Sequence, residues 1–285
     1  MENLSWQIGD VRVTRIQEIE DAGLEWVIAK AGPENLRKIP WLAPHFVNEQ
    51  WEALLSVHAL VVETPELRIV VDTCVGNDKN ISVIKEWHMR TGPFLERFEA
   101  SGFARESIDR VLCTHLHVDH VGWNTILVDG TWQPTFPNAR YLIAQNEWDH
   151  WDGQEDEFST TVLSESVRPI WEAGQVDLVE PTHPVCREVW LEPSPGHTPG
   201  HVSIRIESGD QQAFITGDMI HHPCQFAEPS WGSHADTDWD QGVATRESFF
   251  ESHAGTGMLV IGTHFAGPTA GRVVRDGDTF RLDVD

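Results

Sequence analysis

T-H-L-H-V-D-H-V-G, residues 114–122, follows a short apolar run that is typical of a buried strand and places three histidines and one aspartate within six positions. Because side chains alternate along a strand, His115 and His117 point to the same side. A tight turn can then bring Asp119 and His120 to the same point. Grouping neutral and anionic side chains costs desolvation and repulsion that a cation relieves, so the stretch predicts a metal site.

Apolar, β-branched runs on both sides of this stretch predict further strands, and longer polar runs bounded by Gly or Pro predict helices. Strands are expected at residues 11–16, 58–64, 67–73, 110–115, 139–144, 189–194, 201–208, 212–218 and 258–264, a hairpin at 272–284, and helices at 93–102, 145–151, 164–174 and 240–255. Strands outnumber helices, and the polar residues of catalytic type stand where strands end. The pattern predicts an α+β chain with two packed sheets and outer helices, folded as a single domain over residues 1–285.

Composition limits the partners and the location of the chain. Of 285 residues, 45 are Asp or Glu and 20 are Lys or Arg, which gives a formal net charge of −25. So strong a negative charge argues against nucleic acid and against an anionic membrane, because binding to either depends on Lys and Arg. The first residues form neither a basic nor an apolar leader, and no run reaches the ~18 apolar residues of a membrane-spanning helix, which favours a cytoplasmic protein. The expected partner is a small-molecule substrate, and a homodimer is left open.

Two residue types have an unusual distribution. The four cysteines, Cys74, Cys113, Cys186 and Cys224, are scattered without a C-x-x-C pair, which predicts free thiols rather than a disulfide framework. Thirteen tryptophans accompany a single tyrosine. The tryptophans are expected mostly in the core, with the lining of an apolar ligand pocket as the alternative.

The motif H-x-H-x-D-H resembles the metal-binding motif of the metallo-β-lactamase superfamily, and the resemblance covers nearly the whole chain. It implies an αββα sandwich of two mixed sheets with helices outside. It also implies later ligands, and these follow in order: His197 in S-P-G-H-T-P-G-H, Asp218 in I-T-G-D and His264 in I-G-T-H. Each stands after an apolar strand run in a glycine-containing loop, which lets the backbone approach a metal closely.

The resemblance implies a centre of two divalent metal ions. It assigns His115, His117 and His197 to the first ion, Asp119, His120 and His264 to the second, and Asp218 to both. Imidazole and carboxylate ligands favour zinc, with iron, cobalt and manganese as alternatives. Two ions about 3.5 to 4 Å apart can hold a hydroxide between them, lower its pKa and polarise the bond that it attacks, which predicts hydrolysis.

Further residues are expected to act around the metal ions. Asp72 matches an aspartate that supports the first metal loop in the superfamily, and His201 is expected to support a ligand rather than to be one. Asp119 and His221 are the expected catalytic residues. Lactonases of the superfamily often carry a tyrosine three residues after the bridging aspartate, whereas here that place is His221, with His222 as the alternative. An imidazole there can stabilise an oxyanion or donate a proton near neutral pH.

Several stretches resemble the branch of acyl-homoserine-lactone lactonases and methyl-parathion-hydrolase-like enzymes, among them L-S-V-H-A-L-V-V-E-T, P-N-A-R-Y-L-I-A-Q-N-E-W and T-G-D-M-I-H-H-P. The acidic composition and the aromatic side chains near the motifs favour a neutral, hydrophobic substrate. The expected pocket residues are Phe46, Trp123, His222, Phe226, Trp231 and Phe265. The chain is therefore expected to open a lactone or a carboxylic ester.

Other functions are ranked below this one. Phosphotriester hydrolysis comes next, followed by β-lactam hydrolysis and a glyoxalase II-like thioesterase, whose anionic substrate would want a basic pocket. The net charge of −25 disfavours the nucleases of the superfamily. A metal-stabilised scaffold without activity is the least favoured, because structural zinc sites are closed four-ligand centres and seven ligands shared by two ions leave room for water.

Overall fold

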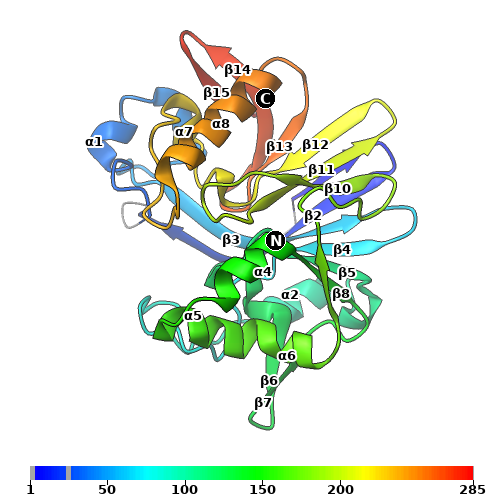
Figure 1. The fold of residues 1–285 in the computed structure, drawn as a ribbon. Coiled ribbons are helices and arrows are strands. Elements are labelled where there is room, and N and C mark those ends of the chain that lie inside the picture. Colours follow the sequence, from blue (N-terminus) through cyan, green and yellow to red (C-terminus); the bar gives the residue numbers. More distant parts are fainter. Residues whose placement is uncertain (1–3, 24–26, 285) are drawn as a thin grey trace. The chain divides into compact units, whose positions relative to one another are not determined.

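The computed structural model of the chain describes residues 4–23 and 27–284 (Figure 1). The chain divides into two compact units. Unit 1 comprises residues 1–18 and 57–181, and unit 2 comprises residues 19–56 and 182–285. The boundaries at residues 18/19 and 56/57 fall inside strands, and each unit is made of two separate stretches of sequence. The single domain expected over residues 1–285 stays a prediction.

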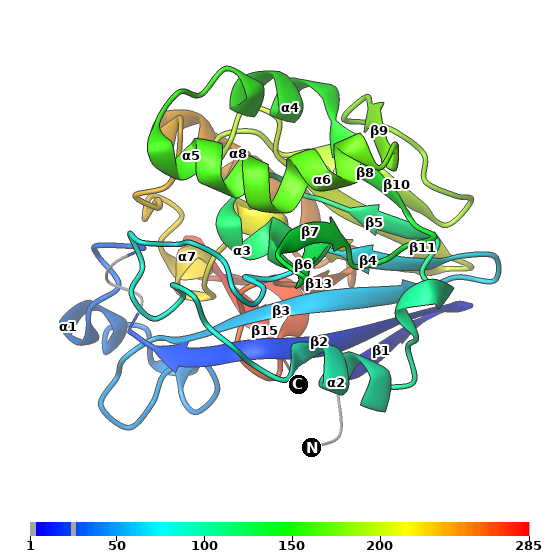
Figure 2. The same ribbon diagram turned by 90° about the horizontal axis from the view of Figure 1, so that it is seen from below.

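Unit 1 is built on a mixed sheet of seven strands in the order β1-β2-β3-β4-β5-β8-β9, and β6 and β7 form a separate hairpin. The strands are β1 (Ser5–Ile8), β2 (Val11–Ala22), β3 (Leu54–Glu63), β4 (Arg68–Val71), β5 (Arg110–Leu112), β6 (Thr125–Val128), β7 (Thr131–Pro134), β8 (Arg140–Ala144) and β9 (Val176–Val179), of which the last residues of β2 and the first of β3 belong to unit 2. The helices are α2 (Phe94–Ala100), α3 (Val118–Val121), α4 (Gln145–Asp152), α5 (Glu157–Val162) and α6 (Arg168–Glu172), with a π-helix at Leu163–Val167 and 3₁₀ turns at Arg105–Ser107 and Gly122–Asn124. Figure 2 shows α4, α5 and α6 as one helical layer of this unit.

The parallel strands of unit 1 bring their carboxyl ends to one edge of the sheet. β4 pairs with β5, and β5 with β8, in parallel, with Val70 opposite Val111 and Val111 opposite Tyr141. All three side chains are buried, which explains why these strands read as continuous apolar runs. The segments that follow β4, β5 and β8 therefore leave the sheet from the same edge.

Unit 2 is built on a six-stranded mixed sheet in the order β10-β11-β12-β13-β14-β15. The strands are β10 (Val189–Pro193), β11 (Val202–Ser208), β12 (Gln211–Ile215), β13 (Leu259–Ile261), β14 (Ala270–Asp276) and β15 (Thr279–Asp283); the helices are α1 (Pro33–Leu36), α7 (Cys224–Ala227) and α8 (Trp239–His253), with 3₁₀ turns at Pro40–Leu42 and Gly217–Met219. β12 and β13 are parallel, and β10 runs in their direction because β11 is antiparallel to both β10 and β12. The loops after β10, β12 and β13 hence start at one edge of this sheet.

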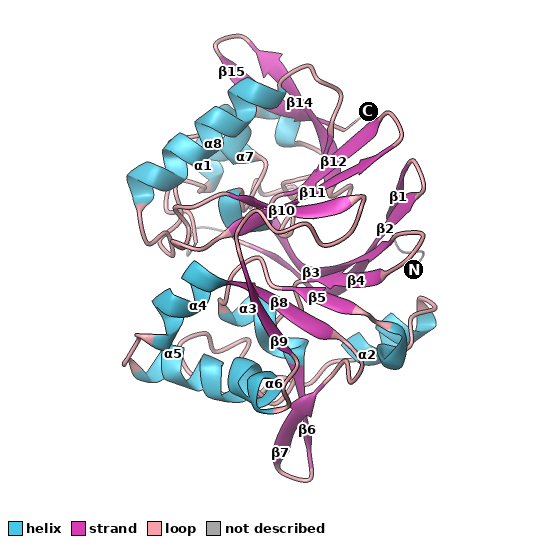
Figure 3. Cartoon of the chain, turned by 45° about the vertical axis from the view of Figure 1, so that its right-hand side comes forward, coloured by secondary structure: helices cyan, strands magenta, loops and turns pink. Residues whose placement is uncertain are grey.

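Figure 3 shows helix α8 beside α7 and the strands of unit 2, and aromatic side chains of α8 belong to the core of this unit. Phe249 packs on Phe214 of β12, with ring centroids 4.7 Å apart. Phe250 stacks on Phe226 of α7 at 4.5 Å and lies 5.5 Å from Phe280 of β15. Burying these rings holds α7 and α8 on the sheet.

Several strands end earlier or later than the sequence predicts, and β1, β6, β7 and β9 are not predicted; two of the differences have a clear local cause. The helix expected at 164–174 is divided into the π-helix and α6, and Pro169 stands in the first turn of α6, where its missing N–H costs least. The strand expected at 67–73 ends at Val71, because Asp72 adopts a left-handed conformation with φ +54°. No helix among the described residues is long and apolar enough to cross a membrane.

A buried lysine ties a loop of unit 1 to the π-helix. Lys79 Nζ donates to Thr125 Oγ1 at 2.6 Å and to the carbonyl oxygen of Glu165 at 2.9 Å, and it lies 3.5 Å from the centroid of the Trp132 ring. Burial lowers the pKa of Lys79 to about 7, against the opposing effect of the Glu165 and Asp78 charges. The folded protein therefore releases this proton far below the pH at which an unfolded chain would.

We expect Lys79 to make the protein more stable as the pH rises above 7. The unfolded chain keeps the lysine proton up to about pH 10.4; between the two pKa values it binds more protons than the folded chain, so the free energy of unfolding rises with pH. The free energy of unfolding is measured by urea denaturation for the wild type and for Lys79→Met. The difference, wild type minus variant, should rise by about 1 kcal/mol per pH unit between about pH 7.5 and 9.5. Lys85→Met, an exposed lysine of the same loop, should show a constant difference. A constant difference for Lys79→Met as well would contradict the expectation.

Candidate metal centre

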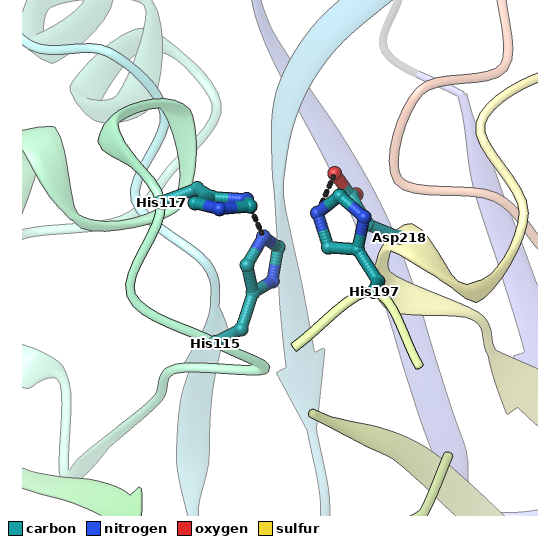
Figure 4. A group of neighbouring side chains, drawn as sticks. All are labelled: His115, His117, His197 and Asp218. Carbon is teal, nitrogen blue, oxygen red and sulfur yellow. Dashed lines mark hydrogen bonds and ion pairs between the residues drawn. The ribbon is translucent and has the colours of Figure 1, made fainter. Parts of the chain in front are cut away.

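The motif residues of unit 1 stand on the loop after β5 and on the first turn of α3. His115 Nε2 and His117 Nδ1 lie 3.0 Å apart (Figure 4). The ring centroids of His115 and His120 are 4.0 Å apart, and His120 Nε2 is 3.8 Å from Asp119 Oδ1. The four side chains of the motif therefore converge, and the rings of His115 and His120 are buried.

Asp72 orients two of these histidines. Its Oδ1 accepts the Thr114 backbone N–H, and its Oδ2 accepts both the Thr114 hydroxyl and His120 Nδ1–H, each at 2.8 Å. Because the Thr114 hydroxyl donates to Asp72, its oxygen accepts His115 Nδ1–H at 3.0 Å. One buried carboxylate thus holds the outer nitrogens of His115 and His120, directly or through Thr114, and their Nε2 atoms face His117 and Asp119.

Glu147 of α4 holds the backbone between the first two histidines. Its Oε1 accepts the Leu116 N–H at 2.9 Å and the indole N–H of Trp151 at 2.7 Å. The Trp151 ring stands edge-on to His117, with centroids 5.3 Å apart. Glu147 is missed by the sequence analysis, because a glutamate in the first turn of a helix is common and carries no functional signal.

A close backbone approach explains the glycine that ends the motif. A Cβ on Gly122 would lie 1.8 Å from the Val75 carbonyl oxygen, and a Cβ on Gly76 would lie 2.8 Å from the Gly122 carbonyl carbon. Glu18 holds this segment by accepting the N–H groups of Val75 at 2.8 Å and Gly76 at 3.3 Å, and it pairs with Arg90 at 2.7 Å. The loop after β4 and the end of the metal motif are thereby packed together.

In unit 2 the carboxylate of Asp218 stands between two histidines. Figure 4 draws its contact with His197. The distance from Oδ2 to His197 Nε2 is 3.4 Å, and the distance from Oδ1 to His264 Nε2 is 3.1 Å. All three side chains are buried. A carboxylate whose two oxygens face different histidines has the geometry to bind two different metal ions.

Protein groups also hold the outer nitrogens of the unit 2 histidines. His197 Nδ1 donates to Asp236 Oδ1 at 2.8 Å, and His264 Nδ1 donates to the Ser56 carbonyl oxygen at 3.0 Å. These bonds keep each ring with Nε2 toward Asp218. Asp236 is missed by the sequence analysis, because it stands in S-H-A-D-T-D, which has the composition of a solvated loop.

His201 supports Asp218 through the backbone. Its Nε2 accepts the Asp218 N–H at 2.9 Å, and its Nδ1 donates to the Ser194 carbonyl oxygen at 3.0 Å. Both ring nitrogens are used in this way. The structure therefore places His201 behind the Asp218 loop.

His221 stands beside Asp218, and one of its ring nitrogens has no partner in the described part of the chain. Its Nε2 is 3.2 Å from Asp218 Oδ2, and its ring lies 4.8 Å from the His197 ring and parallel to the His264 ring at 6.0 Å. Gln225 Oε1 accepts the His221 backbone N–H at 2.7 Å. Over residues 4–23 and 27–284, the buried Nδ1 of His221 has no hydrogen-bond partner. An unpaired buried nitrogen is costly, and a bound ligand can pair with it.

Both ring nitrogens of His222 form hydrogen bonds with the backbone of unit 2. Its Nε2 donates to the Phe46 carbonyl oxygen at 2.9 Å, and its Nδ1 accepts the Cys224 N–H at 3.1 Å. Burial lowers the pKa of His222 to about 4, and the bond to Phe46 opposes this shift. With both nitrogens bonded inside the protein, His222 is a poorer donor to a substrate than His221.

The aromatic residues expected in a substrate pocket lie in the two cores. Phe46, Phe226, Trp231 and Phe265 belong to the hydrophobic core of unit 2. In unit 1 the Trp123 ring stacks on Phe94 at 5.5 Å, and its indole N–H donates to Glu18. Their contribution to a pocket stays a prediction.

The candidate metal-binding groups of each unit are imidazoles and carboxylates. They are His115, His117, Asp119 and His120 in unit 1, and His197, Asp218 and His264 in unit 2. The four cysteines are free, and burial raises the pKa of Cys113 to about 12, which keeps it a thiol. A donor set of this kind fits zinc and other divalent ions of similar preference.

Comparison with known proteins identifies one family. The Metallo-beta-lactamase superfamily matches residues 53–264, which is more than half of the chain. No curated protein matches the chain.

Solved structures similar to the chain include three that cover almost all of it. AidC, a dizinc quorum-quenching lactonase in complex with a product, is 23% identical with a TM-score of 0.80, and the match covers 99% of this chain and 97% of that one. The hydrolase AbOPH of the beta lactamase superfamily is 22% identical with a TM-score of 0.78 over 99% and 97% of the two chains. A probable metal-dependent hydrolase from Staphylococcus aureus is 19% identical with a TM-score of 0.73 over 98% and 99%. At these identities the similarity shows a shared fold and nothing finer.

Proposed function

Since the chain belongs to the metallo-β-lactamase superfamily and is a hydrolase, we propose that it opens a neutral, hydrophobic lactone or carboxylic ester at a centre of two divalent metal ions. The observation that carries this proposal is the carboxylate of Asp218, whose two oxygens face His197 and His264. A structural metal site needs no carboxylate shared in this way.

The seven donor residues divide between the two ions in this proposal. The first ion takes His115, His117 and His197, the second takes Asp119, His120 and His264, and Asp218 binds both. Zinc is the favoured metal, because imidazole and carboxylate are its usual ligands. Two such ions, when bound, supply a water of lowered pKa as the nucleophile and polarise the carbonyl that it attacks.

The protein's own contribution is orientation. Asp72, Asp236 and the Ser56 carbonyl oxygen hold outer nitrogens of the histidines, so the rings are fixed before a metal arrives. Ligands held in this way lose little freedom on binding, which raises metal affinity. Asp119 would serve both as a ligand of the second ion and as a catalytic residue.

His221 is assigned to the leaving group. Its ring lies beside Asp218, and its buried Nδ1 has no hydrogen-bond partner among the described residues. Lactone or ester opening leaves an alkoxide that needs a proton, and an imidazole can donate one near neutral pH. The only tyrosine, Tyr141, cannot take this part, because its hydroxyl donates to the Asn124 carbonyl oxygen inside unit 1.

The charge of the chain supports a neutral substrate. A net charge of −25 repels anionic substrates at long range. Lactones and carboxylic esters rank first, and phosphotriesters rank second because a histidine three residues after the bridging aspartate resembles the methyl-parathion-hydrolase-like group. The product complex of AidC belongs to a lactonase, which agrees with the first choice.

Metal removal tests the centre itself. We expect the purified protein to hold about two divalent ions per chain and to lose hydrolysis of an aryl ester when a chelator strips them. Adding back Zn²⁺ should restore the rate, with full recovery only near two equivalents. Full metal content without any hydrolysis would instead identify a metal-stabilised scaffold.

A substrate panel tests the chemistry. Acyl-homoserine lactones, aryl esters, a paraoxon-like phosphotriester, a chromogenic cephalosporin and a glutathione thioester should be compared as kcat/KM. We expect the lactones and esters to be hydrolysed fastest. A clear preference for the anionic thioester would overturn the proposal, and a preference for the phosphotriester would favour the second choice.

A further inference from the structure

Helix α8 carries a buried arginine whose guanidinium lies behind the metal ligands of unit 2. Arg246 is 0% exposed. Its Nε donates to the Pro229 carbonyl oxygen at 3.1 Å, and its Nη1 donates to the Met219 carbonyl oxygen at 3.2 Å and lies 3.9 Å from Asp236 Oδ2. Burial lowers the pKa of Arg246, and the Asp236 charge opposes this shift. A buried charge is costly unless it is paired and hydrogen-bonded, so this position calls for an explanation.

Asp236 links this guanidinium to the ligand His197. The two carboxylate oxygens have different partners: Oδ1 accepts His197 Nδ1–H at 2.8 Å, whereas Oδ2 accepts the Ser233 N–H at 2.9 Å and faces Arg246. The carboxyl group of Asp236 is fully buried. Its two oxygens therefore join the ligand His197 on one side to the Ser233 backbone and the Arg246 guanidinium on the other.

The same part of α8 holds the backbone around His197. Thr245 Oγ1 donates to the Pro195 carbonyl oxygen at 2.7 Å, and the Asp238 N–H donates to the Gly196 carbonyl oxygen at 2.9 Å. A Cβ on Gly196 would lie 2.3 Å from the Gly242 nitrogen, so the loop and the helix touch through their backbones. α8 therefore fixes the position of the backbone at His197, and Asp236 fixes the orientation of the His197 ring.

Arg246 contacts the second ligand loop of unit 2 as well. Met219, whose carbonyl oxygen accepts from Nη1, follows Asp218 directly. One guanidinium thus contacts the segment that carries the bridging carboxylate and the carboxylate that orients His197. Few other side chains could do both, because the planar guanidinium presents five donors in a fixed geometry.

We propose that Arg246 is a positioning residue of the metal centre, which acts through Asp236 to hold His197 in the ring orientation that binds the first ion. The inference rests on the proposed function, since it presupposes a metal on His197. The effect of Arg246 reaches the centre through Asp236, whose other oxygen holds His197.

Zn²⁺ affinity of single and double variants tests this proposal. Competition with a chromophoric chelator should show one of the two Zn²⁺ ions bound about 10- to 100-fold more weakly in Asp236→Asn and in Arg246→Met, with the other ion unchanged. The double variant should bind that ion no more weakly than Asp236→Asn alone, because the two residues act in series. Additive losses, or equal weakening of both ions, would overturn the proposal.

A second readout and two further variants keep the test decisive. In ¹⁵N-histidine spectra of the wild type, His197 should be protonated at Nδ1, and Arg246→Met should lower or broaden that signal. Arg246→Lys keeps the charge but loses the planar donors, so it should fold and lower the affinity for the same Zn²⁺ ion by a smaller factor. If Arg246→Lys instead shows wild-type affinity and an unchanged His197 signal, the proposal is overturned, even where Arg246→Met fails to fold. The matched control is Arg275→Met. It removes the exposed ion-pair partner of Glu251 of α8 and should change neither readout. A wild-type protein that binds fewer than two Zn²⁺ ions would contradict the proposed function instead.

Discussion

Asp218→Ala should abolish hydrolysis and remove both metal ions together. The carboxylate faces His197 through one oxygen and His264 through the other, so its loss takes a ligand from each ion and leaves two cations without the charge between them. We expect kcat/KM for an aryl ester to fall by about 10⁴-fold or more, the range seen when a residue that serves a whole catalytic unit is removed. Metal analysis of the purified variant should show little bound Zn²⁺.

The control for this variant is an exposed aspartate of unit 2. Asp210 lies in the turn between β11 and β12, and Asp210→Ala should keep both the metal content and the rate. Circular dichroism should show that Asp218→Ala remains folded, because the hydrophobic core of unit 2 does not depend on the carboxylate. Two tightly bound ions in a folded Asp218→Ala would refute the bridging assignment, and loss of a single ion would restrict Asp218 to one site.

Much of the fold could be predicted from local pattern. The apolar runs before Asp72, His115 and Asp218 are strands, the α+β class and the metallo-β-lactamase fold are confirmed, and the helix expected at 240–255 is α8. These predictions succeed because burial on both faces of a parallel strand leaves a continuous apolar run, and because ligands leave the sheet at the ends of such runs.

The support behind the ligands could not be predicted in the same way. Asp236 stands 39 residues from His197, and Glu147 stands 31 residues from Leu116, so no short spacing links them. For Asp72 the signal is the family resemblance and not a local pattern. Long-range hydrogen bonds of this kind depend on the packing of whole elements, which periodicity along one strand or helix does not encode.

In both units a buried carboxylate orients histidine rings by accepting hydrogen bonds from them. In unit 1, Asp72 accepts from His120 and, through Thr114, from His115; in unit 2, Asp236 accepts from His197. Each carboxylate is buried, so the hydrogen bonds are strong and the rings have little freedom. His221 differs from these histidines, because nothing in the described protein holds its Nδ1.

His221→Ala should keep both metal ions and lose rate in proportion to the basicity of the leaving group. The proposed ligand sets do not include His221; its ring lies beside Asp218, and its Nδ1 has no partner among the described residues. We expect kcat for alkyl lactones to fall by about 10- to 1000-fold, the range that a general acid or an oxyanion donor supplies. p-Nitrophenyl esters should lose much less, because nitrophenolate leaves without a proton. Zn²⁺ content should stay at the wild-type value.

The comparison that decides the role of His221 is between the two substrate types in one variant. His45→Ala removes an exposed histidine of unit 2 and should leave both rates unchanged. His221→Gln keeps a hydrogen-bond donor but cannot transfer a proton, so it should recover part of the rate only if His221 stabilises an oxyanion, and none of it if His221 protonates the leaving oxygen. Equal losses for nitrophenyl esters and alkyl lactones would move His221 from proton transfer to substrate positioning. Loss of an ion in His221→Ala would make it a ligand, since its Nε2 lies only 3.2 Å from the carboxylate of Asp218.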